Sequence, residues 1–190
     1  MTDVSRDYVK REFDETLGYI RGDIQWLIDK QTGLNYTIAL LVVCGCEMLA
    51  ACLGDTNRHG ETVFAGFLPD EWQPLAGVLY SALRDGLAHG FDTRHLLVDG
   101  EEHQIHLDAK GPPGIRFART DRGIGLFIRT RSIADALCKR ITDYEVLLQH
   151  DEAACHQFLE ARQRPAVLKG PELATWRALR TESGVRLRAD

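Results

Sequence analysis

The most constraining feature of the sequence is an apolar run, YTIALLVVCGCEMLAACLG, at residues 36–54. A helix that is apolar on all sides belongs either in a protein core or in a membrane. The run is only just long enough to span a bilayer, and it contains Glu47. Inserting such a carboxylate costs roughly 2.5–3.5 kcal/mol. We therefore expect a buried core helix here rather than a membrane span.

The composition indicates a soluble globular chain with no general affinity for nucleic acid. The 190 residues are 44% hydrophobic and 27% charged, which is ordinary for a chain long enough to bury a core. A formal net charge of −5 argues against a surface that is basic everywhere, but it leaves room for a local basic cleft. The charged stretch MTDVSRDYVKREFDE has no apolar signal-peptide core, so we expect a cytoplasmic protein that binds no membrane.

The five cysteines, an odd number, indicate free thiols rather than a disulfide framework. Cys44 and Cys46 are two positions apart on the expected helix, so they point in different directions and should not pair. We expect buried, reduced thiols.

Hydrophobic periodicity predicts a mainly α fold, a bundle of four to five helices with a small antiparallel β insertion at about residues 94–130. Turn signals at Asp99-Gly100 and near residues 121–123 divide the insertion into two strand pairs. We expect helices at residues 3–30, 35–53, about 70–90 and 132–162, with a long turn-rich connection before the third. Ser132 and Asp135 have the spacing of a capping box at the start of the last helix. One domain would cover residues 1–165, and a tail, 166–190, would carry a short helix at 171–182.

The expected core consists of regularly spaced apolar side chains from these helices. They are Val9, Phe13, Leu17, Ile20, Ile24, Leu27 and Ile28 in the first helix, Leu75, Val78, Leu79, Leu83 and Leu87 in the third, and Ile133, Leu137, Ile141, Leu148 and Phe158 in the last.

The histidines and glycines give no sign of a metal or nucleotide cofactor, and we expect neither. His103 and His106 are three apart in an expected strand, so they face opposite sides of it. His150, Cys155 and His156 lack the four-residue spacing that places two ligands on one helix face. The glycines of DRGIGLF lie between strands, where they serve as turn residues.

The stretch SALRDGLAHGFDT, residues 81–93, ends the third helix with Arg84, Asp85 and His89 placed around two glycines. The sequence RDGLAH contains an arginine, an acidic residue directly after it and a histidine. In this motif the chain resembles the HEPN superfamily of helical bundles. These proteins carry an arginine and a histidine separated by four to six residues, often with Asn, Asp or His after the arginine. At the level of helix order the resemblance covers residues 3–92 and 132–162.

The resemblance implies a metal-independent endoribonuclease that acts as a homodimer. Such proteins occur in toxin–antitoxin and other defence systems, so an antitoxin or regulatory protein is the implied partner. Two departures from the family pattern matter. The β insertion is not part of the plain bundle, and Phe91 stands where some of these toxins carry a tyrosine that a partner enzyme modifies. That mode of neutralisation is therefore not expected.

The chemistry of these residues suits RNA cleavage independently of the family. RNA supplies its own nucleophile, the 2′-hydroxyl, so a nuclease needs only a proton carrier and a phosphate clamp. Histidine titrates near neutral pH, and His89 lies near a helix C-terminus whose dipole favours the protonated ring. The guanidinium of Arg84 can bind phosphate oxygens in bidentate fashion and stabilise developing charge.

Helical geometry suggests how the motif is assembled. On a continuous helix Arg84 and His89 lie about 140° apart, whereas Asp85 and His89 are about 40° apart. Asp85 can therefore orient His89. Arg84 can reach the same phosphate only if the helix breaks at Gly86 or Gly90, or if a second subunit completes the site across a two-fold axis.

Glu47 is the expected partner of Arg84, because a carboxylate in the apolar helix is costly to bury unless it is paired. The pair has two interpretations. Glu47 could hold Arg84 in place for catalysis, or the pair could be purely structural while His89 merely caps its helix.

A cluster of basic residues in an otherwise acidic chain suits an RNA backbone. The alternative is an ordinary solvated sheet surface. The candidate RNA-binding residues are Lys110, Arg116, Arg119, Arg122, Arg129 and Arg131. The sequence therefore supports two alternative functions. One is the endoribonuclease, and the other is a non-catalytic module of the same fold that binds RNA, a nucleotide or a protein partner.

Overall fold

The apolar run forms one helix, α3 (Asn35–Cys52), at the centre of the computed structural model of this chain. Helices α2 (Tyr19–Asp29), α4 (Gly60–Ala65), α5 (Ala76–Gly90), α6 (Thr130–His150) and α7 (Glu152–Arg162) all contact it. More than half of its residues are buried, which confirms the expected core helix, although its length and composition alone would also fit a membrane span. The structure describes residues 5–30, 34–55, 57, 59–90, 93, 96–121, 123–162 and 174–178.

The N-terminal helix is continuous but contains a wider π turn. Helix α1 (Arg6–Phe13) passes through the π-helical segment η1 (Asp14–Gly18) into α2. Within this segment the Thr16 hydroxyl donates to the carbonyl oxygen of Glu12 at 2.7 Å. A threonine hydroxyl that bonds to the carbonyl four residues earlier competes with the backbone N–H for that oxygen and often distorts the helix locally. The predicted helix at residues 3–30 is confirmed over its described part.

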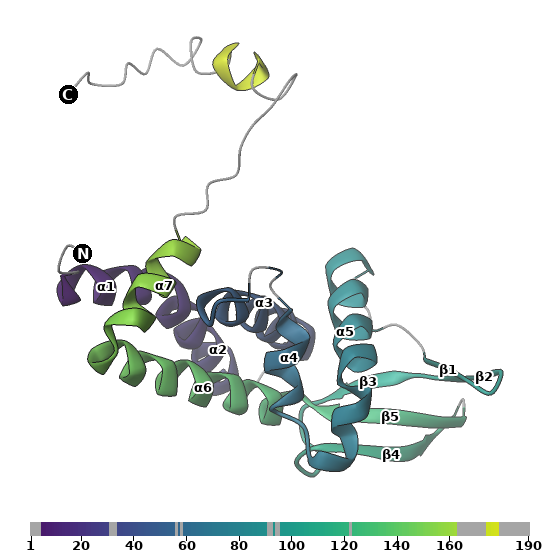
Figure 1. Cartoon of the computed structure of the whole chain (residues 1–190). Coiled ribbons are helices and arrows are strands. Elements are labelled where there is room, and N and C mark those ends of the chain that lie inside the picture. The colour runs from purple at the N-terminus through teal and green to yellow at the C-terminus, as the bar shows by residue number, and fades with distance from the viewer. Residues whose placement is uncertain are drawn as a thin grey trace.

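The remaining helices enclose α3, as Figure 1 shows. The turn-rich connection predicted before α5 contains α4 and a 3-10 helix, η2 (Asp70–Leu75), so it is more ordered than expected. The long helix predicted at 132–162 is two helices, because Asp151 adopts an extended conformation and accepts the backbone N–H of Ala154 at 3.0 Å. Asp151 thus serves as the N-cap of α7. Residues 174–178 are helical, within the short helix predicted in the tail.

The β insertion forms two small sheets rather than one antiparallel sheet. Strands β1 (Leu96–Val98) and β2 (Glu101–His103) make the predicted hairpin, with Asp99 and Gly100 at φ of 52° and 85°. The second sheet has the order β3-β5-β4, from β3 (Ile105–Asp108), β4 (Ile115–Thr120) and β5 (Gly123–Arg129). Strands β4 and β5 pair antiparallel as predicted, but β5 lies between its neighbours and pairs in parallel with β3.

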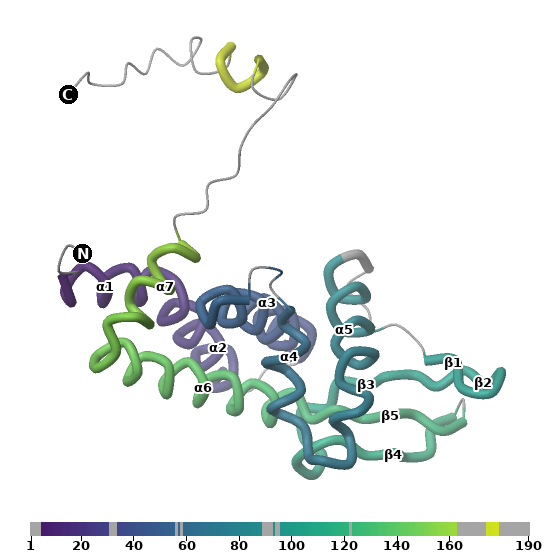
Figure 2. Tube along the Cα trace, in the orientation of Figure 1, coloured from purple at the N-terminus to yellow at the C-terminus, as the bar shows by residue number. Residues whose placement is uncertain are grey.

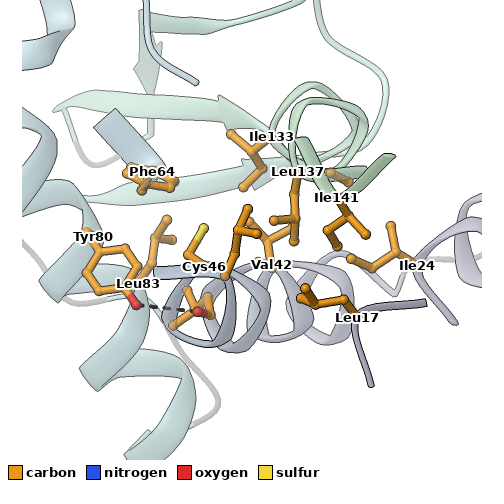
Figure 3. Packing of buried hydrophobic residues seen from close by; sticks show 14 of the residues in the cluster. Leu17, Ile24, Val42, Cys46, Phe64, Tyr80, Leu83, Ile133, Leu137 and Ile141 are labelled. Atoms are coloured by element: carbon orange, nitrogen blue, oxygen red, sulfur yellow. Dashed lines mark hydrogen bonds between the residues drawn. The ribbon is translucent and has the colours of Figure 1, made fainter. Parts of the chain in front are cut away.

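The core joins α3 to the helices on each side of it, and Figure 3 shows its central part. Leu17 and Ile24 pack on one side, Leu137 and Ile141 come from α6, and Phe64 and Leu83 come from α4 and α5. The hydroxyl of Tyr144 in α6 donates to the carbonyl oxygen of Cys52 at 2.9 Å, which ties the C-terminal end of α3 to α6. All five cysteines are free, as expected, but the expected burial holds only for Cys46, Cys52 and Cys155. Cys138 is half-buried and Cys44 is exposed.

Most of the predicted core is confirmed; Ile20 and Leu27 are only partly buried, and two predicted members, in η2 and α5, are exposed. Leu75 and Val78 are 45% and 54% exposed, whereas Leu79, Leu83 and Leu87 are buried. The expected capping box is wrong, because α6 starts directly after β5 with Arg129 at the N-cap. The Ser132 hydroxyl instead accepts the backbone N–H of Gly114 at 3.3 Å.

Candidate functional site

The side chains of Glu47 and Arg84 form an ion pair between α3 and α5. The Nε of Arg84 lies 2.7 Å from Oε1 of Glu47, which confirms the predicted pairing. The side chains are 55% exposed for Arg84 and 32% exposed for Glu47, so the carboxylate is less buried than the apolar surroundings in the sequence suggest. Glu47 also lines a cavity of about 260 Å³ with Cys44, Met48 and Ala51 of α3.

Tyr80 lies one turn before Arg84 on α5 and backs the ion pair from the core. Its ring is 5% exposed, and its hydroxyl donates to the carbonyl oxygen of Val43 at 3.3 Å (Figure 3). Burial raises the pKa of Tyr80 above its ordinary range, and the neighbouring charge of Glu47 raises it further. The phenol therefore stays neutral, and the carboxylate of Glu47 rests against an uncharged group on this side.

Gly60, at the start of α4, allows the backbone to approach the same cluster. A Cβ atom at this position would lie 2.2 Å from the Tyr80 hydroxyl and 2.9 Å from the backbone nitrogen of Glu47. Because the second of these atoms belongs to the backbone, a larger residue cannot be accommodated by a rotamer change alone. Helix α4 thus holds α3 and α5 at the spacing that the ion pair requires.

Asp85 extends the polar cluster along α5. Its Oδ1 lies 4.0 Å from Nη1 of Arg84, and its Oδ2 accepts the hydroxyl of Ser81 at 3.3 Å. The backbone of α5 includes residue 89, four positions after Asp85 and so on the same face of the helix. The side chain of His89 lies outside the described part of the structure, as does Phe91, and the orientation of His89 by Asp85 stays a prediction.

Helix α5 continues without a break through Gly86, as the tube in Figure 2 shows. The break at Gly86 that could have brought Arg84 and His89 together is therefore absent, and α5 reaches Gly90, so the helix end lies beyond both residues. Five residues along a regular helix separate these positions by about 140° around its axis. Within one subunit, α5 therefore carries these two positions on different sides of its axis.

The candidate RNA-binding residues do not form a single surface. Lys110, Arg129 and Arg131 line one pocket of about 260 Å³. Arg116 is paired with Asp108, with Nη2 and Oδ2 2.6 Å apart. Arg119 lies in β4 at an odd number of positions from Arg116, so it belongs to the opposite face of the sheet. Arg122 lies outside the described residues.

The sheet also carries a polar row that the sequence analysis did not single out. His106, Phe127 and Arg116 are directly opposite one another on β3, β5 and β4. The His106 ring stacks on Phe127 with centroids 4.6 Å apart, and the Arg116 guanidinium lies 4.9 Å from the Phe127 centroid. The alternation of side chains along each strand divides the residues of that strand between its two faces. It does not show that β5 lies between β3 and β4, which is what brings the three residues into one row.

Asp108, at the end of β3, anchors this row. Burial opposes its ionisation, but hydrogen bonds from the backbone N–H groups of Lys110 and Gly111 and the pairing with Arg116 lower its pKa overall. Asp108 is therefore an ionised, fully engaged carboxylate and not a free acid or base.

The Glu47–Arg84 pair and the pocket of Lys110, Arg129 and Arg131 lie toward opposite ends of α3. Asn35, at the first turn of α3, lines the basic pocket, and Glu47 is twelve positions further on. At 1.5 Å per residue this corresponds to about 18 Å along the helix axis. The structure thus presents two separate polar regions rather than one.

Among the described residues, no group of three or more His, Cys, Asp or Glu side chains is placed to hold a metal ion. Comparisons of the chain with models of protein families, with curated proteins and with solved structures found no match. The functional argument therefore rests on the residues and their geometry.

Proposed function

We propose that this protein is a metal-independent endoribonuclease of the HEPN type. The observation that carries the proposal is that Arg84, the arginine of the RDGLAH motif, is held at 2.7 Å by Glu47 while more than half of its side chain stays exposed. A phosphate clamp needs both properties: a fixed guanidinium and access for the substrate. Their combination leaves the guanidinium of Arg84 accessible at the C-terminal part of α5.

In the proposed reaction the 2′-hydroxyl of RNA attacks the adjacent phosphorus and the bond to the 5′-oxygen breaks. His89 takes the proton from the 2′-hydroxyl or delivers one to the departing 5′-oxygen, as a group that titrates near neutral pH can do. Arg84 stabilises the negative charge on the phosphate oxygens. Asp85 and Glu47 act as positioning residues for His89 and Arg84. The products are a 2′,3′-cyclic phosphate and a free 5′-hydroxyl.

The continuity of α5 supports a homodimeric site. Since Arg84 and His89 diverge around one helix, Arg84 of one subunit and His89 of the other would act together across a two-fold axis. Because the chain resembles the HEPN superfamily, we assign such a dimer to a toxin–antitoxin or other defence setting, with an antitoxin or regulatory protein as partner. The cytoplasmic setting is proposed from the charged N-terminal stretch and the free cysteines. No cofactor is part of the proposal.

One observation favours the second candidate, a non-catalytic module that binds RNA, a nucleotide or a protein partner. The carboxylate of Glu47 offsets the charge of Arg84, which weakens the attraction of the guanidinium for a phosphate. The same contact thus fixes Arg84 and partly neutralises it, so an activity measurement must decide between the two functions.

The test is to incubate the purified chain with mixed RNA in the presence of EDTA and to analyse the fragment ends. We expect cleavage that leaves 2′,3′-cyclic phosphates, and its loss in His89→Ala with the thermal midpoint close to that of the wild type. Lys139→Gln, which alters an exposed lysine on α6, is the matched control and should cleave normally. Activity that requires an added metal ion, or that survives in His89→Ala, would overturn the mechanism.

A further inference from the structure

The basic pocket lies where the bundle meets the sheet, at the opposite end of α3 from Glu47. Leu27 and Ile28 from α2 and Ile38 from α3 supply apolar lining, and Asn35 lies at the first turn of α3. The Nδ2 of Asn35 donates to the carbonyl oxygen of Leu107 at 3.3 Å, which fixes the start of α3 against β3. Lys110, Arg129 and Arg131 supply the charge.

Every charged residue that lines this pocket is a cation. Among the described residues neither Lys110 nor Arg129 has an ion-pair partner, and Arg131 approaches only the exposed Asp135, at 3.5 Å. Asp108 is opposite Arg129 in the β3–β5 pairing, but its carboxylate is engaged by Arg116 and by two backbone N–H groups. The pocket therefore carries an uncompensated positive charge.

The backbone adds to this charge. Both α3 and α6 begin at the pocket, since Asn35 and Arg131 lie in their first turns, and neither first turn contains an acidic residue. The N-terminus of a helix carries a partial positive charge that favours a bound anion. Two helix dipoles and three cationic side chains thus converge on one cavity.

We propose that this pocket binds a phosphate group. Arginine presents a planar fork that matches phosphate oxygens, and lysine adds a point charge. A volume of about 260 Å³ is near the lower limit for small-molecule pockets and suits a phosphate with an attached sugar. The site does not depend on RNA cleavage at Arg84, because the two regions are separated by about 18 Å along α3.

The test is to measure binding of inorganic phosphate, a nucleoside monophosphate and a short oligoribonucleotide by calorimetry at constant ionic strength. We expect each to bind through its phosphate, and Lys110→Gln and Arg129→Gln to weaken binding about tenfold each. Lys110 lies in an exposed loop, so its variant should fold even if Arg129→Gln is destabilised. Tighter binding of the monophosphate than of the oligoribonucleotide would assign the site to a free nucleotide, and the reverse order would assign it to an RNA backbone.

Arg140→Gln is the matched control, because Arg140 is an exposed arginine on α6 that does not line the pocket. It should bind all three probes as the wild type does. The proposal is overturned if none of the probes binds, or if Arg140→Gln weakens binding as much as Lys110→Gln. The measurements are made in the Arg84→Gln background, which lacks the proposed phosphate clamp of α5 and should not cleave the oligoribonucleotide, so the binding that remains is that of the pocket and its loss is distinct from a loss of cleavage.

Discussion

At the scale of single residues, the ion pair of Glu47 and Arg84 connects stability to the proposed chemistry. The pair is half accessible to solvent, and Tyr80 supports it from the core side. An exposed ion pair contributes little to stability because water screens it, whereas its loss frees a guanidinium to sample other rotamers. We therefore expect the pair to matter more for where Arg84 points than for whether the chain folds.

Glu47→Gln should lower the free energy of unfolding by only about 1 kcal/mol or less, as for a solvent-accessible ion pair. Its cleavage rate should fall more clearly, because Arg84 loses its fixed position. Chemical denaturation of Glu47→Gln, Arg84→Gln and the double variant gives the coupling energy between the two side chains. Strictly additive effects on stability, together with an unchanged cleavage rate in Glu47→Gln, would show that the contact has no role.

The buried phenols of Tyr80 and Tyr144 predict the behaviour of the protein at high pH. Burial raises the pKa of each above the ordinary 10.0 in the folded state, and neighbouring groups that can carry negative charge, such as Glu47 beside Tyr80, raise it further. Below pH 10 both states hold these protons, and the stability is fully present. Above pH 10 the unfolded chain releases them more readily, so stability should fall as the pH rises.

The measurement is a set of denaturation curves between pH 8 and pH 11, compared with those of Tyr80→Phe and Tyr144→Phe. Each variant should show a shallower loss of stability above about pH 10, because one group that ionises only on unfolding has been removed. An unchanged pH dependence in both variants would contradict the burial of these hydroxyls.

At the scale of elements, α4 sets the distance between α3 and α5. Gly60 brings the start of α4 against the Tyr80 hydroxyl and the backbone of Glu47, whereas Gly22 in α2 faces open space. Both glycines lie in helices, but only Gly60 has neighbouring atoms that would clash with a side chain. One is required by a close approach, and the other is not.

Gly60→Ala should destabilise the protein by about 1–3 kcal/mol, since the added methyl group forces backbone atoms apart. Gly22→Ala is the control and should raise stability by up to about 1 kcal/mol, because alanine favours a helix over glycine. Thermal or chemical unfolding of both variants gives the comparison. Equal effects of the two substitutions would show that α4 does not pack as described.

Elements whose signals are local could be predicted from the sequence. The long apolar run predicts α3, the period of the apolar residues predicts most of α1–α2, and Asp99-Gly100 predicts the β1–β2 turn. The order β3-β5-β4 could not be predicted, because alternation within a strand carries no information on which strand lies beside it. The end of α6 was missed because apolar spacing continues across it, while the N-cap at Asp151 depends on one hydrogen bond.

The candidate site, like the fold, could be predicted from the sequence only in part. The cost of an unpaired carboxylate predicts the contact of Glu47 with Arg84, which lie thirty-seven positions apart in the sequence. Charge counting, in contrast, grouped Arg116, Arg119 and Arg129 as one surface. The structure separates them because adjacent residues in a strand face opposite sides, and because Asp108 pairs with Arg116.

At the scale of the whole molecule, the fold places two polar regions at the ends of one central helix. The cluster around Arg84 is proposed for cleavage and the pocket around Arg129 for phosphate binding. Since α3 is buried among the other helices, it fixes the separation of the two regions. Because α5 is continuous, positions 84 and 89 lie on different sides of one helix, and the proposal joins Arg84 to His89 of a second copy of the chain.

The central claim, that Arg84 and His89 act together across two subunits, is tested most directly by mixing two inactive variants. Arg84→Gln and His89→Ala are each expected to cleave no RNA. After unfolding and refolding together, half of the dimers should be mixed, and each mixed dimer should contain one intact site. The mixture should therefore regain about a quarter of the wild-type activity. A mixture that stays inactive although light scattering shows dimers, or a wild-type protein that cleaves no RNA, would contradict the account.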